Sequence, residues 1–101
     1  MYNINMKSKK VISLIKKHRP DLAKFGVKSL ALFGSVAREE AGPESDVDIL
    51  VEFEGRATFD RFMDTKYYLE DILGCRVDLV VPDAIKPRMK PAIMQDLVYI
   101  T

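Results

Sequence analysis

The sequence predicts a single α/β domain of the α+β kind, in which short strands and helices share residues 1–101. Three apolar runs have the length and composition of strands: VKSLALF at 27–33, DVDILVEF at 46–53 and CRVDLVV at 75–81. Helical patterns precede the first run and separate the second from the third. A chain of 101 residues fits one domain with its own hydrophobic core.

The helices are predicted by apolar periodicity and by signals at their ends. Pro20 ends a leading helix, and PDLAKFG then forms a helical turn that Gly26 closes. The main predicted helix spans 58–73, with Thr58 as its N-cap and Gly74 after its end. The leading helix has an apolar stripe of Val11, Ile12, Leu14 and Ile15, and the main helix one of Phe59, Phe62, Met63, Leu69, Ile72 and Leu73.

The remainder of the chain is predicted to be short and interrupted. Pro82 stops the third strand. Pro87 and Pro91 then leave room only for a short helix near 91–96, which the extended segment LVYI follows.

Composition excludes two classes of protein. No apolar run is long enough to cross a membrane, and no secretory signal pattern precedes the fold. Cys75 is the only cysteine, so an intrachain disulfide is impossible and a cytoplasmic location is expected.

Charge is distributed unevenly along the chain. Residues 1–38 carry nine Lys/Arg and one acid, 39–85 carry four and thirteen, and 86–101 carry three and one. The simplest interpretation is a set of solvated helix faces; the alternative is a basic surface that attracts a polyanion or an acidic partner. The segment KSKKVISLIKKHRP has no interleaved aromatic residues, so nucleic acid is not favoured as a direct substrate.

The connection between the first two strands indicates how they pair. Twelve residues separate Phe33 from Asp46, and they include a helical turn, SVARE, and a turn, AGPES. A parallel crossover usually needs a dozen or more residues with a full helix, so an antiparallel pair is favoured. Antiparallel pairing places Gly34 and Ser35 at the same edge of the sheet as Asp46 and Asp48.

The residues at this edge have complementary chemistry. Gly34 allows a tight turn and close approach of the backbone to a ligand, and Ser35 can cap the short helix that follows. Side chains alternate along a strand, so Asp46 and Asp48 share one face. Two such carboxylates suit Mg²⁺, which binds carboxylate and phosphate oxygens. This edge therefore predicts a site for a nucleotide and a metal.

A third carboxylate lies in the third strand. Asp78 is flanked by apolar residues, where an unpaired acid would be costly. If this strand lies beside the other two with Arg76, Asp78 and Val80 on the face of Asp46 and Asp48, three carboxylates converge on a two-metal site. The alternative interpretation is a turn at the sheet edge that carries surface acids.

These residues resemble the signature of a known family. In GSVAREEAGPESDVD, ten residues separate Gly-Ser from Asp-x-Asp, as in the minimal nucleotidyltransferases of the DNA polymerase beta-like superfamily. The leading helix, ALFGS, SDVDILVEF, the connecting helix and VDLVVPDAIKP follow in the family's order, so the resemblance covers nearly the whole chain. It implies a small mixed sheet flanked by helices, two Mg²⁺ ions, and transfer of a nucleoside monophosphate from a nucleoside triphosphate to a hydroxyl.

The resemblance also implies a role for each matching residue. Gly34 and Ser35 match the residues that hold the triphosphate, and Arg38 matches the arginine of the pattern GSxARG. The glycine that usually follows this arginine is Glu39 here, which adds negative charge near the phosphate site. The matches to the metal-binding carboxylates are Asp46, Asp48 and Asp78, the last of which also helps to activate the attacking hydroxyl.

Two kinds of function are consistent with this resemblance. Many minimal members are prokaryotic antitoxins that silence a helical HEPN-type ribonuclease toxin by transferring AMP from ATP to a toxin tyrosine, as in a type VII-like toxin–antitoxin system. The alternative is a catalytically silent antitoxin that neutralises its partner by binding it. Transfer to a small molecule such as an aminoglycoside is less favoured, because no segment of the sequence obviously forms an acceptor pocket.

Overall fold

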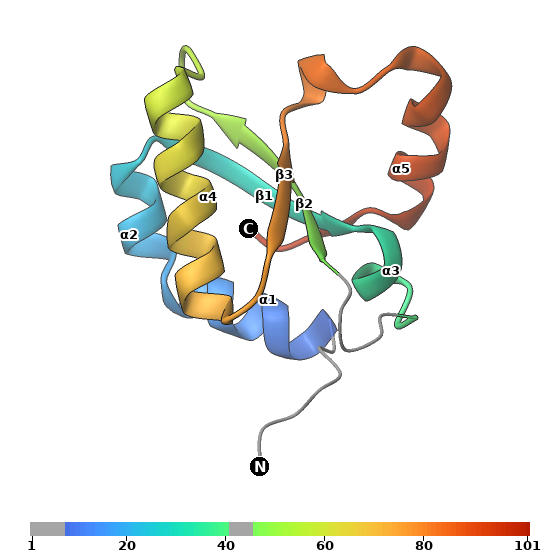
Figure 1. Ribbon diagram of the computed structural model, residues 1–101, viewed down its shortest axis with the longest axis horizontal. Coiled ribbons are helices and arrows are strands. Elements are labelled where there is room, and N and C mark those ends of the chain that lie inside the picture. The colour runs from blue at the N-terminus through green and yellow to red at the C-terminus, as the bar shows by residue number, and fades with distance from the viewer. Residues whose placement is uncertain (1–7, 41–45) are drawn as a thin grey trace.

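The computed structural model describes residues 8–40 and 46–101, and the predicted turn at 41–45 lies outside the described residues. Helices and strands lie along the chain much as the sequence predicts (Figure 1). The elements are α1 (Ser8–Lys17), α2 (Arg19–Lys24), β1 (Val27–Phe33), α3 (Gly34–Ala37), β2 (Val47–Phe53), α4 (Phe59–Leu73), β3 (Val77–Val80), η1 (Pro82–Ala84), η2 (Pro87–Met89), α5 (Lys90–Asp96) and β4 (Val98–Tyr99).

The strands form one mixed sheet in the order β3-β2-β1-β4. β1 pairs antiparallel with both β2 and β4, which confirms the predicted antiparallel arrangement of the first two strands. β2 pairs parallel with β3, and α4 supplies the long crossover that such a pair needs. Because β1 and β2 run in opposite directions, the end of β1 and the start of β2 meet at one edge of the sheet.

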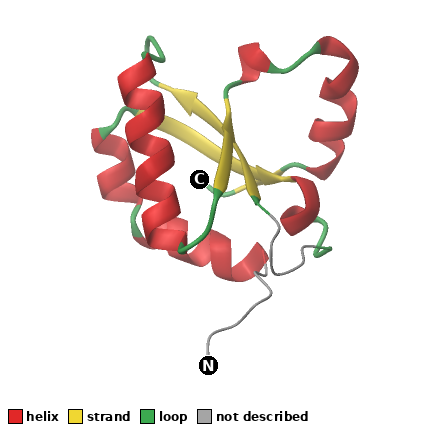
Figure 2. Cartoon of the chain, in the orientation of Figure 1, coloured by secondary structure: helices red, strands yellow, loops and turns green. Residues whose placement is uncertain are grey.

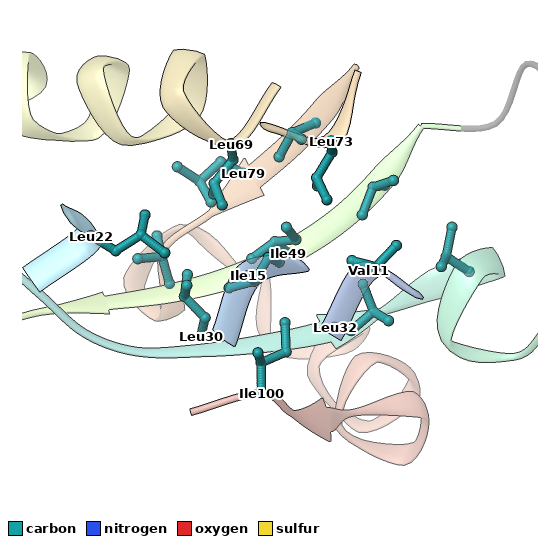
Figure 3. Close-up of a cluster of buried hydrophobic side chains, with 14 residues drawn as sticks. Val11, Ile15, Leu22, Leu30, Leu32, Ile49, Leu69, Leu73, Leu79 and Ile100 are labelled. Carbon is teal, nitrogen blue, oxygen red and sulfur yellow. The ribbon is translucent and has the colours of Figure 1, made fainter. Parts of the chain in front are cut away.

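One face of the sheet carries the main core, shown in Figure 3. The buried residues of β2 on this face, Val47, Ile49 and Val51, alternate as predicted. Helices α1, α2 and α4 cover the face, and Figure 2 shows them on one side of the strands with α5 on the other. The side chains that these helices bury are Val11, Ile15, Leu22, Leu69 and Leu73.

Helix α4 begins and ends where the sequence predicts. The Thr58 hydroxyl accepts a hydrogen bond from the Arg61 backbone N–H at 3.2 Å, and Gly74 closes the helix in the left-handed conformation. The predicted buried stripe is wrong at Phe59, whose side chain is 75% exposed. The stripe instead includes Thr65, which is fully buried. Its hydroxyl donates to the carbonyl of Arg61, so burial leaves this polar group satisfied.

Arg61 holds α4 against two turns. Its guanidinium donates to the backbone carbonyls of Phe25 at 3.0 Å, Gly26 at 3.3 Å and Glu54 at 3.0 Å, and also to that of Arg56. Carbonyl groups outside regular structure are thereby satisfied, and the turn after α2 is fastened to the loop after β2.

The opposite face of the sheet carries a smaller apolar cluster, formed by Ala31, Phe33 and Leu50. Ile93 of α5 and Leu97 pack against it, so α5 covers part of this face. The short helix predicted near 91–96 is thus confirmed as α5, and the extended segment after it forms β4. In the described part of the chain, no helix has both the length and the apolar character needed to cross a membrane.

Candidate active site

The parallel pairing of β2 with β3 brings two of the predicted acids together. Asp48 lies opposite Asp78 in the strand register, and both belong to the face that carries the smaller cluster, as do Leu50 and Val80 two residues further on. Asp48 is partly buried and Asp78 is exposed. Asp46 is exposed and stands one residue before β2 begins.

Asp48 experiences the negative charge of both other acids. The pKa of Asp48 is raised to about 6, mainly by burial and then by the charges of the neighbouring Asp78 and Asp46, while Arg38 opposes the shift. In the free protein the ionised form of Asp48 is thus disfavoured by its surroundings. A cation bound between these carboxylates would offset their mutual repulsion and favour the ionised form.

Gly34 lies directly against Asp48. Its φ of +76° lies in the left-handed region, which favours glycine. A Cβ atom on Gly34 would lie 2.0 Å from Oδ2 of Asp48 and 3.2 Å from its Cβ. Glycine is therefore required here by its conformation and by this close approach. Ser35 follows within α3 and is partly exposed at the same edge.

Arg38 ends α3 and is held by two acids. Its Nε donates to Glu40 at 3.0 Å, and its Nη1 donates to Asp96 of α5 at 2.6 Å. The hydrogen bonds to Glu40 and to Asp96 raise the pKa of Arg38 above its usual value. The arginine predicted from the sequence thus lies close enough to affect Asp48, but its side chain is already paired with protein carboxylates.

Glu39 occupies the place of the family glycine and keeps the glycine conformation. Its φ is +61°, and it is the only residue other than glycine with positive φ among those described. The Glu39 carboxylate accepts hydrogen bonds from the backbone N–H of Ser8, at 3.0 Å, and from the Ser8 hydroxyl. This contact directs the added charge toward the start of α1.

The donor set of the site fits a hard divalent cation. Asp48 and Asp78 supply carboxylate oxygens, which Mg²⁺ prefers, and the mutual repulsion of the acids favours a bound cation. Within residues 8–40 and 46–101, however, no three His, Cys, Asp or Glu side chains are gathered into a group that could hold a metal ion. The predicted convergence of three carboxylates is therefore reduced here to one close pair with Asp46 nearby.

A pocket of about 560 Å³ lies away from these acids. Val51, Phe53 and Pro82 contribute to its lining, at the end of β2 opposite to Asp48. None of the predicted site residues lines it. The acids of the candidate site thus lie at the other end of β2 from this pocket.

Sequence reasoning missed Asp96 and Glu40. Asp96 lies on a separate element, and its carboxylate meets Arg38 only because α5 packs beside α3 (Figure 1). No spacing in the sequence signals that contact. Glu40 lies two residues after Arg38, and no pattern in the sequence indicates their pairing.

Comparison with known proteins gives consistent matches over most of the chain. The family model described as "Nucleotidyltransferase domain" matches residues 8–100. A Methanocaldococcus jannaschii protein named as a candidate protein adenylyltransferase is 46% identical over 89 residues, which are 86% of this chain and 91% of that protein. The "Protein adenylyltransferase MntA" of Thermococcus cleftensis is 39% identical over 89 residues, covering 87% of this chain and 90% of that protein.

Solved structures share the fold. One described as a candidate minimal nucleotidyltransferase has a TM-score of 0.70 and 33% identity, and the match covers 86% of this chain and 93% of the other. A second contains a tri-AMPylated Shewanella oneidensis HEPN toxin in complex with its MNT antitoxin. Its TM-score is 0.58 at 19% identity, and the match covers 92% of this chain and 67% of the other.

Proposed function

This chain belongs to the nucleotidyltransferase domain family, and from that membership we propose that it transfers AMP from ATP to a hydroxyl group of a partner protein. The observation that carries the proposal is the pair of Asp48 and Asp78, with the backbone of Gly34 packed against Asp48. Family membership accounts for nucleotidyl transfer, and the relatives named as protein adenylyltransferases support a protein as the acceptor.

Each predicted residue has a task in this proposal. Asp46, Asp48 and Asp78 would hold two Mg²⁺ ions, which when bound neutralise phosphate oxygens and support in-line attack. Gly34 lets the backbone turn tightly against Asp48, and Ser35 would be a neighbouring hydrogen-bond donor to a phosphate.

The transfer step is a substitution at phosphorus. The acceptor oxygen forms a bond to the α-phosphorus, the bond from that phosphorus to the oxygen bridging it to the β-phosphorus breaks, and pyrophosphate leaves. Asp78 takes the hydroxyl proton, a role for which its exposed position on the outer strand β3 suits it. Because Asp78 is exposed, the partner itself would supply the second wall of the site.

We propose that the partner is a HEPN-type toxin and the acceptor one of its tyrosines. The support is a structure of the same fold in which an MNT antitoxin is bound to a tri-AMPylated HEPN toxin. Tyrosine offers a hydroxyl at the tip of a long, rigid side chain, which can reach an exposed carboxylate such as Asp78. The proposal places this chemistry in the cytoplasm, with ATP as the nucleotide.

A catalytically silent antitoxin is the second candidate. The observation in its favour is that Arg38, expected at the triphosphate, is paired with Glu40 and Asp96. In that case the protein would neutralise its partner by binding alone, and the acids would have no chemical task.

One experiment separates these two candidates. The protein is incubated with Mg²⁺, ATP and a HEPN-type toxin with which it forms a complex, and the intact mass of that toxin is measured. We expect a gain of one or more AMP units with the wild type, none with Asp78→Asn, and an undiminished gain with Asp83→Asn as the matched control from another exposed acid. Complete neutralisation without a mass change, equally good with Asp78→Asn, would contradict the enzyme and support the silent antitoxin.

Binding of the nucleotide is tested separately by calorimetric titration. The double variant Asp46→Asn, Asp48→Asn should lose affinity for Mg²⁺–ATP while its thermal unfolding stays cooperative, because removing two repelling charges does not disturb the core. An affinity equal to that of the wild type would refute the metal site.

A further inference from the structure

Asp96 is the residue that joins α5 to the candidate site. Its Oδ2 accepts a short, charge-assisted hydrogen bond from Nη1 of Arg38 at 2.6 Å. Helices α3 and α5 are in contact, and this bond joins the end of α3 to α5 (Figure 1).

Asp96 is less exposed than Glu40, the other acid that pairs with Arg38, and its neighbours are packed. The Asp96 side chain is 23% exposed, whereas that of Glu40 is 64% exposed. On either side of Asp96, Ile93 and Leu97 pack against the cluster that contains Phe33 and Leu50. Since solvent-exposed ion pairs contribute little, Asp96 is the partner that can fix the position of the guanidinium.

Arg38 also lies close enough to act on Asp48. Its positive charge acts on Asp48, where it opposes the effect of Asp78 and Asp46. A guanidinium that turned fully toward Asp48 would neutralise a carboxylate that the proposed function assigns to a cation. The contact with Asp96 holds Nη1 away from that arrangement.

The two ion pairs also leave part of the guanidinium available. To the residues that the structure describes, Arg38 donates through Nε and Nη1. The Nη2 amino group, which is planar with these two nitrogens, remains to donate to a phosphate oxygen. Because the guanidinium is planar, the direction of Nη2 is set once Nε and Nη1 are held by their partners.

We infer that Asp96 is a positioning residue for triphosphate binding: it holds the Arg38 guanidinium in the orientation that presents Nη2 to phosphate and keeps it off Asp48. This inference rests on the proposed function, because it assigns Arg38 to the triphosphate of ATP. Asp96 itself does not touch the nucleotide in this arrangement, and its effect passes through Arg38.

The test measures the dissociation constant of Mg²⁺–ATP by calorimetry. Asp96→Asn keeps the shape of the side chain but loses its charge, and we expect roughly tenfold weaker binding. Asp96→Glu restores the charge and should recover most of the affinity. Glu40→Gln is the matched control at the exposed partner, and it should change the dissociation constant less than about threefold.

A double-variant cycle shows whether the effect passes through Arg38. In the Arg38→Met background, Asp96→Asn should cause no further loss of affinity. Thermal unfolding of each variant is measured in parallel, and we expect the melting temperature of Asp96→Asn to stay close to that of the wild type because the apolar contacts of Ile93 and Leu97 are unchanged. A purely structural role would instead lower the melting temperature and persist without Arg38.

The outcomes distinguish this inference from the proposed function. If the wild type does not bind Mg²⁺–ATP, the proposed function fails first and the inference with it. If the wild type binds but Asp96→Asn binds equally well, or if Asp96→Asn weakens binding as much in the Arg38→Met background, the inference is overturned and the proposed function stands.

Discussion

Replacing Gly34 with alanine tests the closest contact of the candidate site. The added methyl group would meet the Asp48 carboxylate at 2.0 Å from Oδ2 and 2.9 Å from Cγ. Gly55→Ala is the matched control, because Gly55 has nearly the same backbone conformation, with φ of +72° against +76°, and nothing within 4 Å of the methyl position. The difference between the two variants isolates the contact with Asp48.

The expected magnitudes follow from the geometry. Alanine in the left-handed region costs about 1–2 kcal/mol, and part of that is offset by the lower entropy of the unfolded chain, so Gly55→Ala should lose about 1 kcal/mol. In Gly34→Ala the Asp48 side chain must also leave its rotamer. Rotation cannot relieve the 3.2 Å contact between the new methyl group and Cβ of Asp48, because that Cβ does not move when the side chain rotates. Forced rotamers cost about 0.5–1.5 kcal/mol, so we expect Gly34→Ala to lose about 2–3 kcal/mol in total.

Urea and thermal unfolding in the presence of a chelator measure these losses, and each kcal/mol should lower the melting temperature by about 4–8 °C. In the Asp48→Ala background the two shortest contacts no longer exist, so the additional cost of Gly34→Ala should fall toward that of Gly55→Ala. If Gly34→Ala costs no more than Gly55→Ala, with or without Asp48, the close packing of this backbone against the acid is refuted. Binding of Mg²⁺–ATP should be lost in Gly34→Ala and retained in Gly55→Ala.

Three further predictions concern the framework around the site. The backbone N–H of Val77 donates to Glu70 and, as the largest cause, lowers the pKa of that carboxyl below its usual value. The free energy of unfolding of Glu70→Gln, measured in urea at neutral pH, should therefore be about 1 kcal/mol below that of the wild type. In acid the two proteins should be equally stable, because the contribution of the carboxylate disappears as pH falls through the lowered pKa. Arg61→Lys should cost about 2–3 kcal/mol in urea unfolding, since lysine cannot donate to four carbonyls in a plane, and a change under about 0.5 kcal/mol would argue against that clamp. Thr58→Ala should cost about 1 kcal/mol and speed hydrogen exchange at the Arg61 amide, and an unchanged exchange rate there would contradict the cap.

Local signals in the sequence were sufficient for most of the fold. Thr58 and Gly74 mark the ends of α4 because their side-chain and backbone preferences act over a single turn. The antiparallel pair of β1 and β2 followed from a connection too short for a helical crossover, and the structure confirms it. The face of Asp48 followed from the alternation of β2, which is confirmed by the burial of Val47, Ile49 and Val51 on the other side.

Features that depend on distant elements could not be predicted in this way. Apolar periodicity included Phe59 in the buried stripe, but this residue begins α4 beyond the edge of the core and is exposed. The third strand was expected to span 75–81, whereas pairing with β2 extends only over Val77–Val80.

Some contacts of the candidate site were likewise predictable from local patterns in the sequence, and others were not. Gly34 and Asp48 were predicted to be neighbours at one edge of the sheet, and the structure confirms their proximity. The steric dependence of one on the other appears only in the register of Phe33 with Asp48. The pairing of Arg38 with Asp96 depends on where α5 lies, which no local pattern encodes.

The position of β4 determines when this site can form during folding. Leu30, in the first strand, exchanges backbone hydrogen bonds with Ile100 and Thr101, so β1 completes its pairing only with the most distant described part of the chain. Contacts of such long sequence separation slow folding, because the intervening chain must first be ordered. The contact of Arg38 with Asp96 joins residues that lie much further apart in the sequence than the acids Asp48 and Asp78 do. The arrangement around Arg38 therefore depends on more long-range order than the acidic pair does.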